Sequence, residues 1–276
     1  MVTEPETRLA LIESGEADIV TTLPLATVQD LAANRQLLVD RRFTLAVSYV
    51  AMTVAGPLRS AEARQALCWA FPYDDVIDGI YEGFAKRAVG PVAELCRGFN
   101  PDTFVYSTDL DRARALLQRA GVAENTTITY ALPAGNREAN AIPELFATNL
   151  AALGLQLDIQ VIDFATYIDL SFGALPAEER PNLFSFFWSP DYNDAWNHLW
   201  PQVSCAAWQA GNVGQFCNER VEALLEEAKI ATDQTRYFAA LAEIQQIVTR
   251  DDPAARSTSL RPSGRPCYAA IWLGST

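Results

Sequence analysis

The amino-acid sequence predicts an α/β fold, and three neighbouring segments support that prediction. Residues 127–132 alternate as a strand does, residues 138–153 carry apolar side chains at helical spacing, and residues 155–161 alternate strictly between apolar and polar. A strand, a helix and a strand within about 35 residues form a right-handed βαβ unit with parallel strands. Half of the 276 residues are apolar, so the chain can bury a substantial core.

The segments before this unit continue the α/β pattern. Residues 8–19 predict a short amphipathic helix that stops at Gly15 and is followed by a strand. Residues 43–52 (FTLAVSYVAM) predict a buried strand. Ser60 is the expected N-cap of a helix that reaches about Tyr81. Residues 86–106, broken by glycines and prolines, predict a surface loop.

A further helix and a helical hairpin are also predicted. Thr108 and Asp111 form a capping box before an apolar stripe that ends at Gly121. Residues 182–188 (NLFSFFW) predict another buried strand, and residues 189–217 read as an irregular aromatic and polar stretch. Asn218 and Asp233 each cap a helix, and the pair is expected to form a hairpin.

The last segment differs from the rest. Residues 250–276 contain four Arg and three Pro, show no periodicity, and carry no acidic residue after Asp252. This segment is either an ordinary disordered terminus or the product of a premature end or a shifted reading frame.

Composition excludes several classes of function. The formal charge of −13 repels phosphate backbones, so we do not expect nucleic-acid binding. The signatures GxGxxG, GxxxxGK[ST], HExxH and GxSxG do not occur, so dinucleotide, nucleoside-triphosphate, zinc-protease and serine-hydrolase sites lack their parts. With one His, His198, between tryptophans, and no CxxC pair, neither a metal nor another cofactor is expected.

The candidate binding site is the sequence WSPDYN, which begins at Trp188. Trp188 and Tyr192 flank Asp191, with Asn193 next, at the carboxyl end of a predicted strand, where open α/β sheets bind ligands. A carboxylate among aromatic rings suits a cationic amine, and a purely structural aromatic turn is the alternative. Asp191 and Asp194 also suggest an acid–base hydrolase, but such pairs usually face each other across a cleft from different elements.

The cysteines leave two interpretations open. Cys205 and Cys217 bracket a loop rich in Gly and Asn, which suits a local disulfide in an oxidising compartment, and two free thiols are the alternative. Cys68, inside a predicted helix, is expected to be a small buried hydrophobe.

Five segments, in order over residues 8–253, resemble family 5 of the extracytoplasmic solute-binding proteins, the peptide-binding components of ATP-binding-cassette importers. They are RLALIESGEADI from Arg8, SAEARQALCWAFPYDDVIDGIYEGFAKRAVGPV from Ser60, DLDRARALLQRAG from Asp109, WSPDYND from Trp188 and DQTRYFAALAEIQQIVTRDDP from Asp233. Where this family usually carries a helix-compatible residue, the chain has Pro72, so we expect a kink there.

The resemblance implies a type II periplasmic-binding-protein architecture with two lobes. We expect residues 1–46 to be a remnant of lobe one with the approach to the hinge, 47–250 to be lobe two, and 251–276 to be an irregular, aberrant tail. Members begin with a secretion signal and a long first lobe, so the chain is expected to be a truncated fragment. Glu4 and Glu6, with no apolar run, indicate that its start is not a signal peptide.

The resemblance also implies a function without chemistry: binding of a peptide or another small solute for import. The expected partner is a membrane permease, the expected location is the periplasm or cell envelope, and the complete protein is expected to be a monomer. In peptide-binding members the Asp of W-x-x-D-Y receives the ligand's α-amino group; here it is Asp191, and Trp188 would line the site beside Tyr192 and Asn193. The same lobe also occurs as the ligand sensor of cytoplasmic transcriptional regulators, which is the alternative function.

Overall fold

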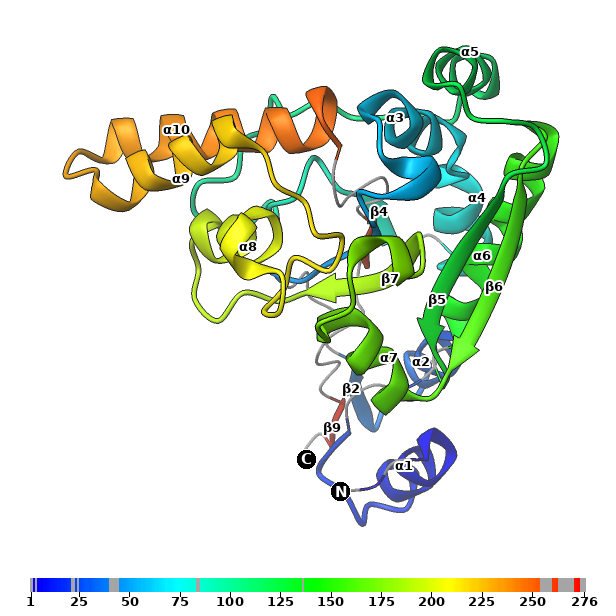
Figure 1. Cartoon of the computed structure of the whole chain (residues 1–276). Helices are drawn as coiled ribbons and strands as arrows, with labels where there is room; N and C mark the ends of the chain where they lie inside the picture. The colour runs from blue at the N-terminus through cyan, green and yellow to red at the C-terminus, as the bar shows by residue number, and fades with distance from the viewer. Residues whose placement is uncertain are drawn as a thin grey trace.

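The centre of the molecule is a mixed sheet of six strands (Figure 1). The computed structural model describes residues 2, 4–20, 23, 25–39, 45–82, 85–135, 137–253, 260–262 and 271–273. The order of strands in this sheet is β4-β8-β3-β7-β5-β6. The strands are β3 (Val47–Met52), β4 (Ala85–Arg87), β5 (Thr127–Pro133), β6 (Gln156–Ile162), β7 (Leu183–Trp188) and β8 (Leu260–Pro262).

Parallel pairing of β5 with β6 confirms the predicted βαβ unit. Thr127 lies opposite Gln156, and β5 is also parallel to β7. β3 runs antiparallel to β7, with Val47 opposite Trp188. The carboxyl ends of β5, β6 and β7 therefore point the same way, and the fold is α/β as predicted.

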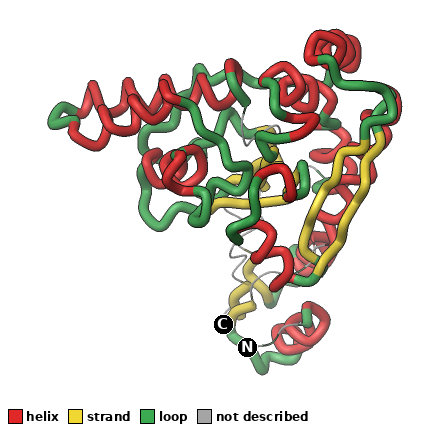
Figure 2. Tube along the Cα trace, in the orientation of Figure 1, coloured by secondary structure: helices red, strands yellow, loops and turns green. Residues whose placement is uncertain are grey.

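Helices cover both faces of this sheet (Figures 1 and 2). On one face α3 (Ala61–Ala70) and α6 (Arg137–Ala152) pack against the sheet, with α5 (Leu110–Ala120) against α3. On the other face α7 (Phe164–Phe172) packs through Tyr167 against Tyr49 and Phe184. The two faces of one strand thus bury different side chains, as the period of two requires.

A separate group of helices extends beside the carboxyl end of β7 (Figure 1). It consists of α8 (Ala195–Val203), α9 (Glu219–Ile230) and α10 (Gln234–Gln246). The predicted hairpin of α9 and α10 is present, and Asn218 and Asp233 accept hydrogen bonds from backbone N–H groups two and three residues further on. The apolar stripes of the three helices pack into one core with Val47.

The N-terminal residues form a second, smaller sheet. Its strands are β1 (Ile19–Val20), β9 (Ile271–Leu273) and β2 (Leu37–Val39), in that order and antiparallel. The helices α1 (Pro5–Glu13) and α2 (Leu25–Leu31) lie beside it. Its apolar residues form a cluster of their own: Ile12, Val20, Leu23, Val28 and Leu31.

The C-terminal segment, predicted to be irregular, contributes β8 and β9, one strand to each sheet. Its other residues beyond position 253 lie outside the described residues, as do residues 43 and 44 of the predicted strand over 43–52. The proposed division at residues 46 and 250 stays a prediction.

The predicted single helix from Ser60 to Tyr81 is wrong. Ser60 does cap α3, accepting the N–H of Ala63 at 3.2 Å, but α3 ends at Ala70. Pro72 breaks the helix because it has no N–H and forces the preceding Phe71 into an extended conformation. Two short pieces follow, α4 (Tyr73–Asp75) and the π-helix η2 (Val76–Ile80).

The predicted capping box of α5 is also wrong by one residue. The cap is Asp109, whose carboxylate accepts the N–H of Arg112 at 2.9 Å. The Thr108 hydroxyl instead donates to the carbonyl oxygen of Phe71 at 2.7 Å, a long-range bond that sequence spacing does not reveal. Gly121 ends the helix as predicted, with φ of 69°.

None of the helices formed by the described residues is both long and apolar enough to cross a membrane. Short helical turns connect the longer elements. The remaining turns are η1 (Gly56–Leu58), η3 (Ala177–Glu179), η4 (Cys205–Ala207) and η5 (Ile247–Asp251).

Arg64 of α3 is a buried cation that links this helix to Asp252 and Pro253, which follow η5. Its side chain is 3% exposed and pairs with the Asp252 carboxylate. It also donates to the carbonyl oxygens of Pro253 at 2.9 Å and Leu58 at 2.7 Å. Asp252 in turn accepts from the Asn218 amide at 3.0 Å, so this ion pair also holds the N-cap of α9. A buried charge requires such partners.

We expect Arg64→Met to lower the free energy of unfolding by about 3 kcal/mol or more, because it leaves buried acceptors unpaired. Urea unfolding measures the loss. Arg59→Ala is the matched control. The side chains of Arg59 and its ion-pair partner Glu178 are 70% and 62% exposed, so loss of this pair should cost less than about 1 kcal/mol. Equal effects of the two substitutions would contradict the role of Arg64.

Candidate functional site

The predicted ligand-binding residues lie where β7 ends and α8 begins. Trp188 is the last residue of β7, and Asp191, Tyr192 and Asn193 lie in the loop that precedes α8. In Figure 1 the arrowhead of β7 lies beside α8. The loop is therefore at the carboxyl end of a central strand, as predicted for an open α/β sheet.

One buried residue of α8, Asn197, holds the loop at two points. The Trp188 indole donates from Nε1 to the Asn197 carbonyl oxygen at 2.7 Å. The Asp191 backbone N–H donates to Asn197 Oδ1 at 2.6 Å. Asn197 is 9% exposed and both bonds are partly buried, so they fix the path of the loop.

The far end of the loop is fixed by a neighbouring loop. Asn193 Oδ1 accepts the backbone N–H of Arg97 at 2.9 Å, and the Ala195 N–H donates to the Arg97 carbonyl oxygen at 2.8 Å. The side-chain oxygen of Asn193 therefore has a structural partner.

Asp194 also has a structural role. Its Oδ1 caps α8 by accepting the Trp196 N–H at 2.9 Å, and it accepts the Tyr237 hydroxyl of α10 at 2.6 Å. Burial and, after it, the hydrogen bond to Asp194 raise the pKa of Tyr237, so the phenol stays protonated and remains a donor. This use of Asp194 argues against the acid–base pair considered for Asp191 and Asp194.

Asp191, Tyr192 and Asn193 are the exposed members of the predicted set, whereas Trp188 is half-buried. Tyr192 is 52% exposed, and its pKa is raised by partial burial first and then by the negative charge of Asp194. None of the described residues forms a hydrogen bond or ion pair with the Asp191 carboxylate. The hydrogen bond that Asp191 does form comes from its backbone N–H. The loop thus presents an exposed carboxylate next in sequence to an exposed aromatic residue, a pair of residue types suited to a cation.

The residues that position this loop were missed at the sequence level. The stretch 189–217 was expected to be irregular, yet it contains α8, with Asp194 as its N-cap and Pro201 inside it. The Asp before an apolar-aromatic run was the available signal, and Pro201 obscured it. His198 lies on this helix and is fully buried, consistent with its predicted packing role.

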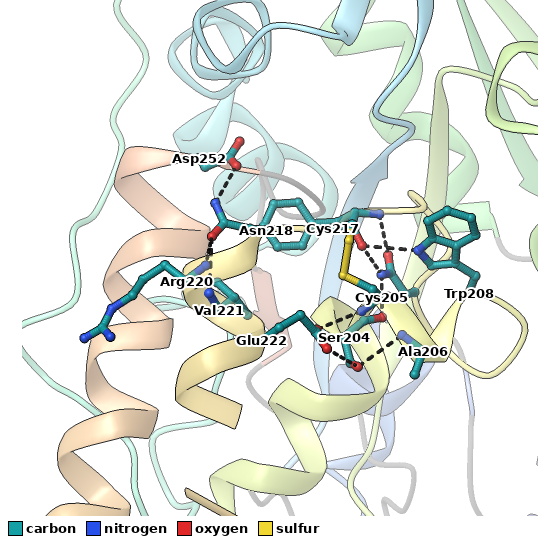
Figure 3. The surroundings of a disulfide bond; sticks show 12 residues. Ser204, Cys205, Ala206, Trp208, Cys217, Asn218, Arg220, Val221, Glu222 and Asp252 are labelled. Atoms are coloured by element: carbon teal, nitrogen blue, oxygen red, sulfur yellow. Dashed lines mark hydrogen bonds between the residues drawn. A yellow bond between two sulfur atoms is a disulfide. The ribbon is translucent and has the colours of Figure 1, made fainter. Parts of the chain in front are cut away.

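The chain from α8 to α9 is closed by a disulfide between Cys205 and Cys217 (Figure 3). Their Cα atoms are 4.8 Å apart. Inside the loop, buried Asn212 donates to the carbonyl oxygens of Ser204 at 3.0 Å and Phe216 at 2.7 Å, and accepts the Phe216 N–H at 2.9 Å. Of the two interpretations left open by the sequence, the structure has the disulfide, and the hydrogen bonds of Asn212 hold the loop that it closes.

Two further cysteines are buried as free thiols. Cys68 is fully buried in α3, as predicted, and Cys96 is 4% exposed. Burial raises the pKa of both thiols, for Cys96 to about 11. No group of three or more His, Cys, Asp or Glu side chains in the described part of the chain could hold a metal ion.

Comparison with known proteins places similar sequences in one family of solute-binding proteins. The family described as bacterial extracellular solute-binding proteins, family 5 Middle, matches residues 1–210. Di/tripeptide-binding protein 3 of Pseudomonas aeruginosa is 27% identical over 274 residues, which is 96% of this chain and 50% of that protein. Di/tripeptide-binding protein 4 of the same organism is 31% identical over 252 residues, 89% of this chain and 46% of that protein.

Solved structures show the same fold. A dipeptide-binding protein from Pseudoalteromonas in complex with Met-Leu matches 99% of this chain and 53% of its own, with a TM-score of 0.86 and 21% identity. The periplasmic binding protein DppA of Helicobacter pylori, in complex with the peptide STSA, matches 98% of this chain and 51% of its own, with a TM-score of 0.82 and 24% identity. The chain spans about half the length of the relatives it matches.

Peptide mapping by mass spectrometry tests the state of the cysteines. Without reductant, we expect Cys205 and Cys217 in one disulfide-linked peptide, and Cys68 and Cys96 without label after iodoacetamide treatment of the native protein at pH 8. The thiolate is the reactive form, and the raised pKa values keep both buried residues as thiols. Denaturant should expose both to labelling. Label on Cys205 and Cys217 before reduction would contradict the disulfide.

Proposed function

Because the chain belongs to family 5 of the bacterial extracellular solute-binding proteins, we propose that it binds peptides, without chemistry, for an ATP-binding-cassette importer. The di/tripeptide-binding relatives support a peptide as the solute. The observation that carries the proposal is the exposed Asp191 carboxylate, which no described residue pairs, followed in the sequence by exposed Tyr192.

In this proposal Asp191 anchors the α-amino group of the peptide. An ammonium at Asp191 gains a charge-assisted hydrogen bond and contact with an aromatic face. Trp188 and Asn193 act mainly through position, since the polar groups of their side chains bond to the backbone of α8 and of the neighbouring loop. Pre-setting the loop lowers the cost of ordering it around a ligand.

The partner would be a membrane permease, and the location would be the periplasm or cell envelope. The Helicobacter pylori protein is described as an ABC transporter-associated periplasmic binding protein, which supports both assignments. The Cys205–Cys217 disulfide suits the same compartment, since disulfides persist where thiols are oxidised.

The alternatives have less support. The comparisons offer no support for a transcriptional regulator, because the relatives named above are peptide-binding proteins. An acid–base hydrolase would need Asp194 as a reactive group, whereas Asp194 caps α8 and bonds Tyr237.

We expect Asp191→Ala, in the full product of the gene, to weaken peptide binding by about 2 to 5 kcal/mol, because the ligand amine then lies unpaired in a closed site. Isothermal calorimetry with alanine tripeptide measures the loss. Asp158→Ala is the control: Asp158 is an exposed carboxylate on β6 that accepts a hydrogen bond from the Gln160 amide at 2.7 Å, and its loss should leave affinity unchanged. Unchanged affinity of the Asp191 variant would refute the anchor.

We also expect the 276-residue chain by itself to bind the same peptide far more weakly than the full product of the gene. A small ligand in a buried site has most of its surface enclosed, and the family resemblance divides that site between two lobes. With one lobe, Asp191 stays solvated and its ion pair is worth only about 0 to 1 kcal/mol. Submicromolar binding by a monomeric sample in calorimetry and sedimentation would contradict a divided site.

A further inference from the structure

The outer end of β7 exposes an aromatic side chain that the sequence predicted to be buried. Phe187 is 60% exposed, whereas its neighbours Phe186 and Trp188 are half-buried and pack on the α7 face of the sheet. The expectation of a buried strand over residues 182–188 is therefore wrong at this position. On the same side of β7, Leu183 is buried in the core with α3 and α6, whereas Phe187, four residues further on, lies outside that core.

The alternation of β7 continues into the loop. Ser189 and Asp191 are exposed, and Pro190 between them is half-buried. A residue before proline is held extended, so Ser189 prolongs the strand geometry. In extended chain, side chains two residues apart lie on the same side. Phe187, Ser189 and Asp191 therefore form one exposed row that ends at the proposed amine anchor.

The two ends of this row are complementary to an extended peptide. Asp191 is four positions beyond Phe187, roughly 13 Å in extended chain at about 3.3 Å per residue. In a peptide whose amino group lies at Asp191, the third Cα is about 7 Å further along, and a large side chain there covers most of the remaining distance. A shorter side chain, or one on the first residue, does not reach the ring.

Resting on the proposed function, we propose that Phe187 selects peptides with a large apolar or aromatic third side chain. The side chain packs on the Phe187 ring while the amino terminus is held by Asp191. Aromatic pairs prefer offset or edge-to-face contact, and the Phe187 ring, whose centroid lies 6.4 Å from that of Phe186 at an interplanar angle of 26°, is exposed enough to accept one. Phe187 is thus a specificity-determining residue for the third ligand position.

Calorimetry on the full product of the gene tests this with four peptides: Ala-Ala-Ala, Ala-Ala-Phe, Ala-Phe-Ala and Phe-Ala-Ala. We expect Ala-Ala-Phe to bind about tenfold more tightly than Ala-Ala-Ala, an effect in the range of one buried aromatic contact. Phe187→Ala should reduce this preference to about twofold or less, and Phe187→Tyr should keep it, since the ring remains.

Phe164→Ala is the matched control. Phe164 is 66% exposed and is the first residue of α7, which follows β6 rather than β7 in the chain. We expect it to leave the preference for Ala-Ala-Phe intact, with thermal unfolding showing that all three variants fold.

The outcomes separate the two proposals. If Ala-Ala-Ala is not bound, or Asp191→Ala does not weaken it, the proposed function fails. If Ala-Ala-Ala is bound through Asp191 but Ala-Ala-Phe shows no advantage, or Phe187→Ala keeps it, only the role of Phe187 is wrong. Equal loss for all four peptides in Phe187→Ala would indicate that another part of the protein covers the ring, which also overturns the selection.

Discussion

The bonds that Asn197 makes to the end of β7 determine where the candidate site lies. Its backbone oxygen accepts the Trp188 indole and its side-chain oxygen accepts the Asp191 N–H, so a strand end, a loop and a helix meet at one buried amide. Because Asn197 belongs to α8, the helix must form for the loop to have this path. α8 in turn depends on Asp194, its N-cap, and Asp194 on Tyr237 of α10. The helical hairpin therefore supports the site although it does not line it.

The sequence predicts well those parts of this fold that local physics decides. The parallel strands β5 and β6 with α6 between them follow from periodicity, and the caps at Ser60, Asn218 and Asp233 follow from side chains that reach a backbone N–H within three residues. The loop with Asp191 was located because it follows a strand of strong β propensity. Each of these features is set by interactions over a few residues.

The features that sequence reasoning missed depend on contacts between distant residues. Thr108 bonds Phe71 across the core, so the cap of α5 moves to Asp109. α8 forms despite Pro201 because its apolar side packs with α9 and α10. Phe187 is exposed although Leu183, on the same side of β7, is buried in the core. No pattern within one segment contains this information, and the propensity of the segment is overridden by its surroundings.

The position of β9 between β1 and β2 affects how the protein is made. During synthesis the residues of β1 and β2 are made before those of β9, so their sheet has a gap until residues 271–273 arrive. The hairpin of α9 and α10, in contrast, closes between neighbours in sequence and needs no later residue. Contacts of high sequence separation form slowly because a long loop must close first. The nascent chain therefore carries two unpaired strand edges between the synthesis of β2 and that of β9, which is when a chaperone that covers such edges would matter most.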